Sequence, residues 1–388
     1  MRRRSPDYLL VALCVLLAVG AITAPYVTSL MLVFRAAGLG GPLARAAEWA
    51  AHPITVHAVS SLPTRAGAIR TRLYEPADGF DRAVLLVPGI HAAGIDEVRL
   101  TKLAMDLAGA GVAVLTFGLP DLQAFRITPE STDLLEDAMY WMSSQPGLAK
   151  DGKIGVVGVS FAGGLSVVAA GRPQVRNRIA FVVSFGGHSD LPRVMRYLAT
   201  GQEPPVEGLT SHPPHDYGVA VILYGIAQAV VPPEQVDALR DGVRTFLVAS
   251  QETLVDQARA NRTLQRARDL AATLPKPSRR YLTWVLERNT HALGAVLAPE
   301  LEHLASDLPA LSAERAPTRP AAPVFLLHGA ADTVIPAAES VFLRRHLGSA
   351  VPTRLLLSHL ITHAEVDESA SMAEAWRLVA FWADILRR

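Results

Sequence analysis

A serine flanked by small residues stands out in the middle of the chain. The heptad GVSFAGG, residues 158–164, joins the apolar run KIGVV to the run LSVVAAG. A serine on a tight turn between a strand and a helix can act as a nucleophile, because the turn exposes its hydroxyl above the sheet. The pattern differs from G-x-S-x-G only at its fifth position, where Ala162 adds one methyl group. We therefore expect Ser160 to be a nucleophile, the alternative being a glycine-rich helix start used for close packing or phosphate binding.

The elements that must position this serine are short apolar runs alternating with helical stretches. Paired strands are expected within residues 54–76, and buried strands are expected at AVLLVPG, VAVLTF, KIGVVGV, IAFVVSF, VFLLHG and TRLLLS. Helical patterns separate the earlier runs, and AEAWRLVAFWADIL closes the chain. Buried strands of about 5 to 7 residues alternating with helices predict βαβ units in a parallel sheet. The predicted fold class is therefore α/β.

With the serine placed between a strand and a helix, residues 54–198 and 323–388 resemble the α/β-hydrolase family. The resemblance implies a mostly parallel sheet flanked by helices, with Ser, Asp or Glu, and His following one another along the chain. The acid of that family usually lies in a segment similar to HGxxDxxxP, which here is HGAADTVIP and contains Asp332. Asp190, in GGHSDL after the run IAFVVSF, is the alternative acid, because some members carry theirs at that point.

The same resemblance implies a histidine in the loop after the last strand, where the chain has two. His359 directly follows TRLLLS, and His363 lies in ITHAEV. A general base must reach both the serine hydroxyl and the carboxylate, which favours the tip of a loop over its first residue. We therefore expect His363 to be the base, with His359 as the alternative.

An acyl-transfer mechanism also needs N–H donors for the oxyanion. In the family these are the backbone N–H after the nucleophile, here that of Phe161, and one from the loop after an early strand. That loop is VPGIHAAG, residues 87–94, in which Ile90 is the expected second donor. His91 either lines the site or is an ordinary polar loop residue. The loop lacks the HGGG string of some lipases.

About 120 residues between the two groups of strands carry only helical periodicity, which predicts a cap or lid. The expected organisation is an N-terminal membrane anchor or signal peptide over 1–35, the first part of an α/β-hydrolase core over 36–198, a helical cap or lid insertion over 199–316, and the second part of the core over 317–388. Within the insertion, residues 217–231 are almost entirely apolar but too few to span a membrane. They are expected to form a lid helix buried against the sheet domain, the alternatives being a wall for an acyl chain or a face that dips into a bilayer.

The N-terminus has the pattern of a membrane anchor. Residues 8–34 contain no charged side chain, and Arg2, Arg3 and Arg4 precede them. This stretch exceeds the ~20 residues that cross a bilayer, and the arginines favour a cytoplasmic N-terminus. We expect a single-pass membrane protein with an N-terminal transmembrane helix and an extracytoplasmic catalytic domain. The alternative is a signal peptide cut after Ala21.

Composition excludes several other classes. The chain has 37 basic and 36 acidic residues without a block of like charges, so no nucleic-acid partner is expected. Cys14 is the single cysteine, which excludes an internal disulfide and a cysteine-ligated metal site. Motifs for zinc proteases, nucleotides and dinucleotides are absent from the sequence, so no cofactor and no metal are expected.

These patterns predict a membrane-anchored, carboxylesterase-like serine hydrolase that cleaves a carboxylic ester or related acyl substrate through an acyl-enzyme. In this mechanism Ser160 attacks, His363 transfers the proton and Asp332 orients the histidine. An acyltransferase with the same triad and a non-catalytic membrane-tethered scaffold of the same fold are the alternatives.

Overall fold

The computed structural model describes residues 7–38, 41–58, 61–253, 255–304, 309–361 and 372–388, without the side chains of residues 7–19, 303, 304 and 309. Its strands are β1 Ile54–Ala58, β2 Leu62–Thr64, β3 Gly67–Ile69, β4 Thr71–Pro76, β5 Arg82–Val87, β6 Val112–Phe117, β7 Ile154–Val159, β8 Ile179–Phe185, β9 Val324–Gly329 and β10 Thr353–Ser358. Its α-helices are α1 Asp7–Ala36, α2 Pro42–Trp49, α3 Val98–Ala108, α4 Pro120–Gln123, α5 Pro129–Ser143, α6 Phe161–Ala170, α7 Leu191–Thr200, α8 Tyr217–Val230, α9 Pro233–Glu252, α10 Gln257–Thr273, α11 Ser278–Leu286, α12 Thr290–Leu304, α13 Ala338–Leu347 and α14 Met372–Ile385.

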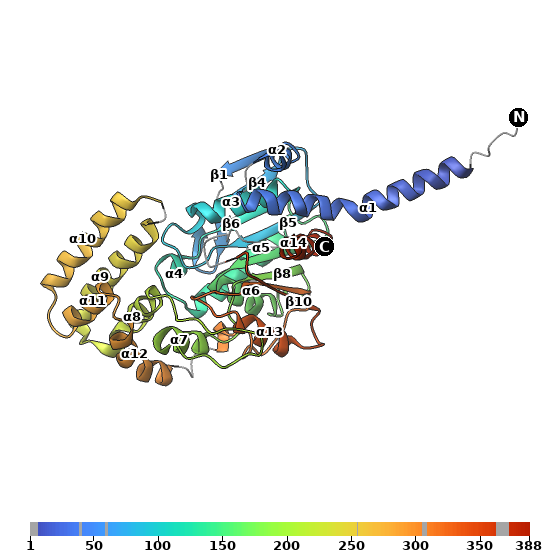
Figure 1. Cartoon of the computed structure of the whole chain (residues 1–388). Coiled ribbons are helices and arrows are strands. Elements are labelled where there is room, and N and C mark those ends of the chain that lie inside the picture. The colour runs from blue at the N-terminus through green and yellow to red at the C-terminus, as the bar shows by residue number, and fades with distance from the viewer. Residues whose placement is uncertain (1–6, 39–40, 59–60, 254, 305–308, 362–371) are drawn as a thin grey trace, which may run out of the picture.

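Eight of the described strands form one sheet in the order β1-β4-β6-β5-β7-β8-β9-β10 (Figure 1). β4 pairs antiparallel with both β1 and β6, and the other neighbours are parallel. The carboxyl ends of β5, β7, β8, β9 and β10 therefore meet at one edge, where loops can bring distant residues together. This architecture confirms the predicted α/β class and the mostly parallel sheet flanked by helices.

The central strands are buried on both faces, as their unbroken apolar sequences predict. Successive residues of β5 belong to different clusters: Leu85 and Val87 lie in one core, and Val84 and Leu86 lie in the other. This alternation follows from the period of two along a strand. Helices α5 and α6 cover the first face, and α1, α3 and α14 contribute to the core on the second face.

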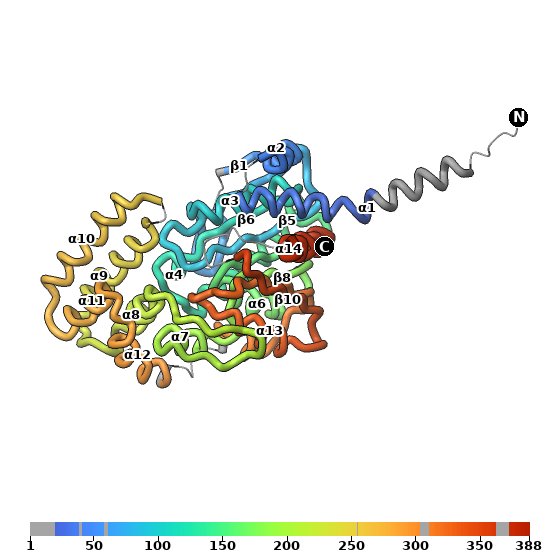
Figure 2. Tube along the Cα trace, in the orientation of Figure 1, coloured from blue at the N-terminus to red at the C-terminus, as the bar shows by residue number. Residues whose placement is uncertain are grey.

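The region between α7 and β9 contains α8 to α12, and no strand is found among its described residues. Figure 1 shows α9, α10 and α11 gathered on the side of the molecule opposite the projecting end of α1, and Figure 2 shows the same three helices from the same side. The apolar segment predicted to be a lid helix forms α8, whose residues 218–223 are buried. Its apolar face is therefore used in packing within the protein.

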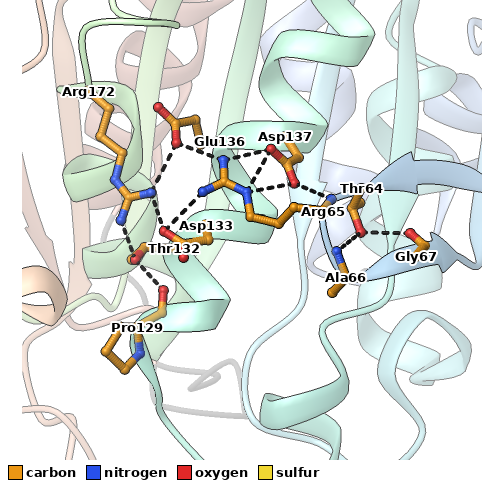
Figure 3. Close-up of polar contacts among 10 residues, drawn as sticks. All are labelled: Thr64, Arg65, Ala66, Gly67, Pro129, Thr132, Asp133, Glu136, Asp137 and Arg172. Atoms are coloured by element: carbon orange, nitrogen blue, oxygen red, sulfur yellow. Dashed lines mark hydrogen bonds and ion pairs between the residues drawn. The ribbon is translucent and has the colours of Figure 1, made fainter.

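A small hairpin, β2 and β3, is attached to the side of the core by ion pairs (Figure 3). Arg65, in its turn, donates from its backbone N–H to Asp137 at 2.8 Å and from its guanidinium to Glu136 at 3.0 Å. Arg172, after α6, donates to Glu136 at 3.1 Å and to Asp133 at 2.6 Å. Both arginines thus bind carboxylates of α5. Arg65 attaches the hairpin to α5, and Arg172 attaches the end of α6 to the same helix.

The second half of α1 packs on the body of the protein. Ser29 Oγ donates to the Val379 carbonyl of α14 at 2.6 Å, and Tyr26 stacks on Trp376 with the ring centroids 5.8 Å apart. At the end of the helix the buried Arg35 donates to the carbonyls of Ala47 and Asp106 at 3.1 and 2.9 Å. In Figure 1, α1 runs from this docked part outward, away from the body.

The predicted membrane anchor coincides with α1. Within the part of the chain that the structure describes, no helix has the length and apolar character needed to cross a membrane. The side chains of the predicted span before Gly20 lie outside that part.

Candidate active site

Ser160 occupies a strained turn between β7 and α6. Its φ of 56° and ψ of −134° fall in a region that costs a non-glycine residue about 1–3 kcal/mol. The turn is held at both sides, because the Ser160 N–H donates to the Phe185 carbonyl at 2.7 Å and the Ser160 carbonyl accepts from the Gly163 N–H at 2.7 Å. This strand-turn-helix geometry is the one in which a serine hydroxyl is exposed for nucleophilic attack.

The glycines around Ser160 are required by close backbone contacts. A Cβ at Gly158 would lie 2.4 Å from the Ala162 carbonyl oxygen, and a Cβ at Gly163 would lie 2.7 Å from Ser184 Oγ. Ala162 itself is fully buried in the first turn of α6, so the methyl group at the fifth position of the motif is accommodated. The glycines of the heptad are therefore needed for close packing, which was the alternative role, and the same heptad also places Ser160 in the turn.

The expected oxyanion loop lies beside Ser160 because β5 and β7 are parallel neighbours. A Cβ added to Gly89 would come within 3.1 Å of Ser160 Cβ and 3.8 Å of its Oγ. The next residue, Ile90, is buried. Phe161 follows Ser160 in the chain and is the first residue of α6, so its N–H has no acceptor within the helix. The two expected donors therefore belong to the residue after Ser160 and to the residue after Gly89.

His91 takes part in the conformation of this loop. Its Nδ1 accepts from the Ala93 N–H at 3.1 Å, so the neutral ring carries its proton on Nε2. Burial lowers the pKa of His91, opposed by the nearby Glu97 carboxylate, which raises the pKa. The structure thus gives His91 a bond within the loop, and its possible contact with substrate stays a prediction.

Asp332 lies in a tight turn directly after β9 and is 5% exposed. Its Oδ1 accepts from the N–H groups of Val334 and Ile335 at 2.8 and 3.0 Å. A Cβ at Gly186, which follows β8, would be 3.5 Å from Asp332 Oδ2. In the sheet, β8 lies between β7 and β9. Asp332 Oδ2 is therefore on the side of its turn that faces the carboxyl end of β8.

The turn that contains Asp332 is stabilised by hydrogen bonds of His328 and Ser340. His328 Nε2 donates to the Ile335 carbonyl at 2.8 Å and lies 3.6 Å from Asp332 Oδ2. Ser340 Oγ, on α13, is 2.7 Å from His328 Nδ1 and donates to it, because Nε2 holds the ring proton. Both side chains are fully buried. The sequence motif pointed to Asp332 but not to these supporting groups.

Asp190, the alternative acid, has both carboxylate oxygens engaged at a helix start. Its Oδ1 accepts from the Arg193 N–H at 3.0 Å and caps α7, and its Oδ2 accepts from Arg315 Nε at 2.5 Å. The Asp190 N–H donates to Glu339 at 2.9 Å. These bonds give Asp190 a structural role in the loop after β8.

His359 and His363 are the two candidate bases. His359 is exposed in the turn after β10. His363, the expected base, lies outside the described residues. The structure therefore brings Ser160 close to both expected oxyanion residues, Phe161 and Ile90. It places Asp332 after β9, which is two strands away from β7 in the sheet.

Two residues of the helical region between α7 and β9 also lie near these groups; Tyr217 belongs to the apolar segment singled out in the sequence, whereas no sequence pattern had indicated Gln251. Gln251, near the end of α9, accepts from the Ala92 N–H at 3.1 Å and donates to the Ile90 carbonyl at 3.3 Å. Tyr217, at the start of α8, has its pKa raised by burial and by the negative charge of Asp332. The cap thus contacts the oxyanion loop through Gln251, and Tyr217 lies within electrostatic range of the acid.

A cavity of about 140 Å³ lies between the acid turn and residues 203–212. Ala330, Asp332 and Pro336 form its wall on the core side. Ser160 is not among its lining residues, so this cavity adjoins the acid and not the nucleophile. No group of three or more His, Cys, Asp or Glu side chains suited to a metal ion occurs in the described ranges.

Neither a protein-family model nor a curated protein matches the chain. Solved structures of esterases and peptidases resemble it. An esterase from Pyrobaculum calidifontis is 15% identical, with a TM-score of 0.45, over 98% of this chain and 99% of that one. A thermostable carboxylesterase cloned from a metagenomic library is 13% identical, with a TM-score of 0.43, over 86% of this chain and 89% of that one. An acylaminoacyl peptidase is 11% identical, with a TM-score of 0.46, over 86% of this chain and 41% of that one.

Proposed function

We propose that the chain is a serine hydrolase that cleaves a carboxylic ester or related acyl substrate through an acyl-enzyme. The observation that carries the proposal is the strained backbone of Ser160, at the end of β7 and directly beside Gly89 of the neighbouring loop. Strain of this kind persists where the surrounding structure over-determines it, and such residues cluster at active sites. A residue used only for helix packing would not need this conformation.

The proposed mechanism assigns each step to one group. Ser160 Oγ attacks the carbonyl carbon while His363 accepts the hydroxyl proton, and the N–H groups of Phe161 and Ile90 stabilise the tetrahedral oxyanion. His363 then returns the proton to the leaving group, which departs as the acyl-enzyme forms. Asp332 orients the imidazole and stabilises its charged form. Water, activated by the same histidine, attacks the acyl-enzyme and releases the acid product.

Ser160→Ala is the direct test. We expect hydrolysis of a p-nitrophenyl ester to fall by about 10⁴-fold or more, and labelling by a fluorophosphonate probe to disappear. Ser144→Ala, at an exposed helix end, is the matched control and should leave both unchanged. Unchanged hydrolysis by Ser160→Ala would remove the proposed function and favour the scaffold alternative. Release of an acylated alcohol instead of free acid, with an added acceptor, would favour the acyltransferase.

The choice of base has its own test. We expect His363→Ala to abolish labelling of Ser160 and His359→Ala to leave it within a few-fold of wild type, because only one imidazole can receive the hydroxyl proton. The opposite result would assign the base to His359. Thermal unfolding of both variants serves as the control for folding.

We propose further that the first half of α1 anchors the protein in a membrane, with the catalytic domain on the extracytoplasmic side. The uncharged residues 8–25, which precede the docked part of the helix, support this proposal, as do the arginines before them. The full-length protein should remain with membranes after alkaline carbonate extraction, and its N-terminal peptide should begin before Ile22. Recovery of a protein that begins at Ile22 would instead establish a cleaved signal peptide.

A further inference from the structure

Two glutamine side chains hold the loop that carries the Ile90 N–H. Gln123, from α4 of the core, lies against its far end: a Cβ at Gly94, whose φ is +53°, would be 2.2 Å from Gln123 Nε2. Gln251, from α9 of the cap, binds the near end at Ile90 and Ala92. The loop is therefore held by the core at one end and by the cap at the other.

The contact with Gln251 has the geometry of strand pairing. A carboxamide offers one acceptor and one donor on the same edge, as the C=O and N–H of one residue in a neighbouring strand do. Gln251 Oε1 accepts from the Ala92 N–H at 3.1 Å, and its Nε2 donates to the Ile90 carbonyl at 3.3 Å. The two partners are two residues apart, so the side chain fixes the backbone between them. Gln251 therefore bonds to both peptide planes that meet at His91, and the Ile90 N–H lies on the peptide plane directly before them.

The remaining N–H groups of the loop show what this arrangement leaves available. Ala93 donates to His91 Nδ1, and Gly94 donates to the His91 carbonyl at 2.9 Å. For the Ile90 N–H, no hydrogen bond is found in the part of the chain that the structure describes. The N–H groups of Ala92, Ala93 and Gly94 are thus occupied, whereas the N–H group expected to bind the oxyanion is left open.

The cap end of this contact is itself braced. Glu252, the next residue, accepts from Thr263 Oγ1 at 2.6 Å and pairs with Arg259 Nε at 2.6 Å. Both partners belong to α10, so the corner between α9 and α10 holds the end of α9. A movement of these two helices would therefore move Gln251 relative to β5.

We propose that Gln251 is a positioning residue that holds the Ile90 N–H in its oxyanion-binding orientation and makes this orientation depend on the placement of the helical cap. This inference rests on the proposed function. It also links the position of α9 to the chemical step. A substrate or partner that displaces α9 would change the rate of that step as well as access to the site. The bound substrate carries no oxyanion, and the negative charge develops only as the tetrahedral intermediate forms, so a misplaced donor lowers kcat and leaves KM unchanged.

The test compares Gln251→Met with Gln265→Met in the full-length protein. Methionine has a similar length but cannot pair with the loop, and Gln265 lies on α10, where its Nε2 donates to Asp269 at 2.9 Å. We expect Gln251→Met to lower kcat for p-nitrophenyl acetate about 10-fold at unchanged KM, a part of the ~10²-fold loss when an oxyanion donor is removed. The rate of fluorophosphonate labelling should fall equally, and Gln265→Met should match wild type. Unchanged kcat, or a higher KM at unchanged kcat, would overturn the proposal.

Gln251→Glu supplies a readout that a purely structural contact would not move. The ionised carboxylate accepts from Ala92 but repels the Ile90 carbonyl, whereas the protonated acid can restore both bonds. The ratio of its labelling rate to that of wild type should therefore rise several-fold between pH 8 and pH 5. A constant ratio would contradict the proposal, and the measurement holds even where Gln251→Met folds poorly.

Ser160→Ala separates the two proposals. If wild type is labelled and Ser160→Ala is not, the proposed function stands, and a wild-type rate for Gln251→Met then removes only the positioning role. If wild type is not labelled at all, both proposals fall together.

Discussion

The two turns that carry the serine and the acid are built by different means. The elbow at Ser160 is held by backbone: its own N–H and carbonyl are bonded, and Gly158 and Gly163 leave no room for a Cβ. The turn at Asp332 is held by side chains, through His328 and Ser340. The turn at Ser160 therefore requires glycines that leave room for neighbouring atoms, whereas the turn at Asp332 requires particular polar side chains.

This difference has a physical origin. The elbow lies where α6 passes close to β8, so helix and strand backbones must approach each other. The acid turn lies after β9, where its polar groups are buried and each needs a partner. Added volume should therefore damage the elbow, and a lost hydrogen bond should damage the acid turn.

The largest expected effect concerns the charge of Asp332. Asp332→Asn keeps an oxygen for the Val334 and Ile335 N–H groups but removes the carboxylate that stabilises the charged base. We expect kcat for a p-nitrophenyl ester to fall by about 10³–10⁴-fold, with the thermal unfolding temperature nearly unchanged.

Asp190→Asn is the matched control for that substitution. It keeps the Oδ1 acceptor that caps α7 but removes the charge that pairs with Arg315, so stability should fall by about 1 kcal/mol while kcat stays within a few-fold of wild type. If Asp190→Asn abolished activity and Asp332→Asn did not, the acid would have to be reassigned.

The next effect tests the intolerance of the elbow to volume. Gly163→Ala would place a Cβ 2.7 Å from Ser184 Oγ, and overpacking of this kind costs about 1–3 kcal/mol. We expect urea unfolding to show a loss in that range. Gly225→Ala, at an exposed position of α8 with no heavy atom within 4 Å of the added Cβ, should be neutral or stabilising by up to ~1 kcal/mol. Equal effects at both glycines would contradict the comparison.

A pH effect of similar size comes from His188, in the loop between the two turns. Burial lowers the pKa of His188 to about 4, and its Nε2 donates to the Leu311 carbonyl at 2.7 Å. The unfolded chain, with a pKa near ~6.5, binds the proton more tightly, so stability is complete above that pH and is lost as the pH falls toward 4. We expect a loss of about 2 kcal/mol between pH 6.5 and pH 5.

His188→Gln isolates this contribution, because glutamine can donate to Leu311 but does not titrate in this range. Urea unfolding at pH 7 and pH 5 should show a smaller loss for the variant than for wild type. Equal losses would mean that His188 does not govern the pH dependence.

The smallest expected effect is on the acid turn. Ser340→Ala removes the donor to His328 Nδ1 and leaves a buried nitrogen unpaired, which should cost about 1 kcal/mol in urea unfolding. A loss of kcat should accompany it, since the turn that holds Asp332 loosens. An unchanged kcat would mean that the other hydrogen bonds of the turn are sufficient.

The fold was predictable because β5 to β9 are buried on both faces and so appear as short apolar runs. Elements with weaker local signals were not recognised. The hairpin β2–β3 has three residues in each strand and depends on Arg65 contacting α5, far along the chain. Four-residue α4 is likewise too short to show helical periodicity.

The candidate site was predictable only where residues are neighbours in sequence. GVSFAGG marks its own turn, because the glycines that it needs lie within the same heptad. Asp190 also carried a local signal, since an Asp two residues before a Pro is typical of a helix start, and the structure shows that cap. Gln251 had none: its partner loop lies about 160 residues earlier, and nothing in α9 distinguishes this glutamine from its neighbours.

The docking of α1 limits how the protein could move at a membrane surface. The helix continues from Asp7 to Ala36, and its part from Tyr26 to Arg35 is bonded to α14, α2 and α3. If the first half of this helix is embedded as proposed, tilting the helix would tilt the whole domain. The candidate site would then keep one orientation relative to the membrane, and substrates would be selected by where they lie as well as by their chemistry.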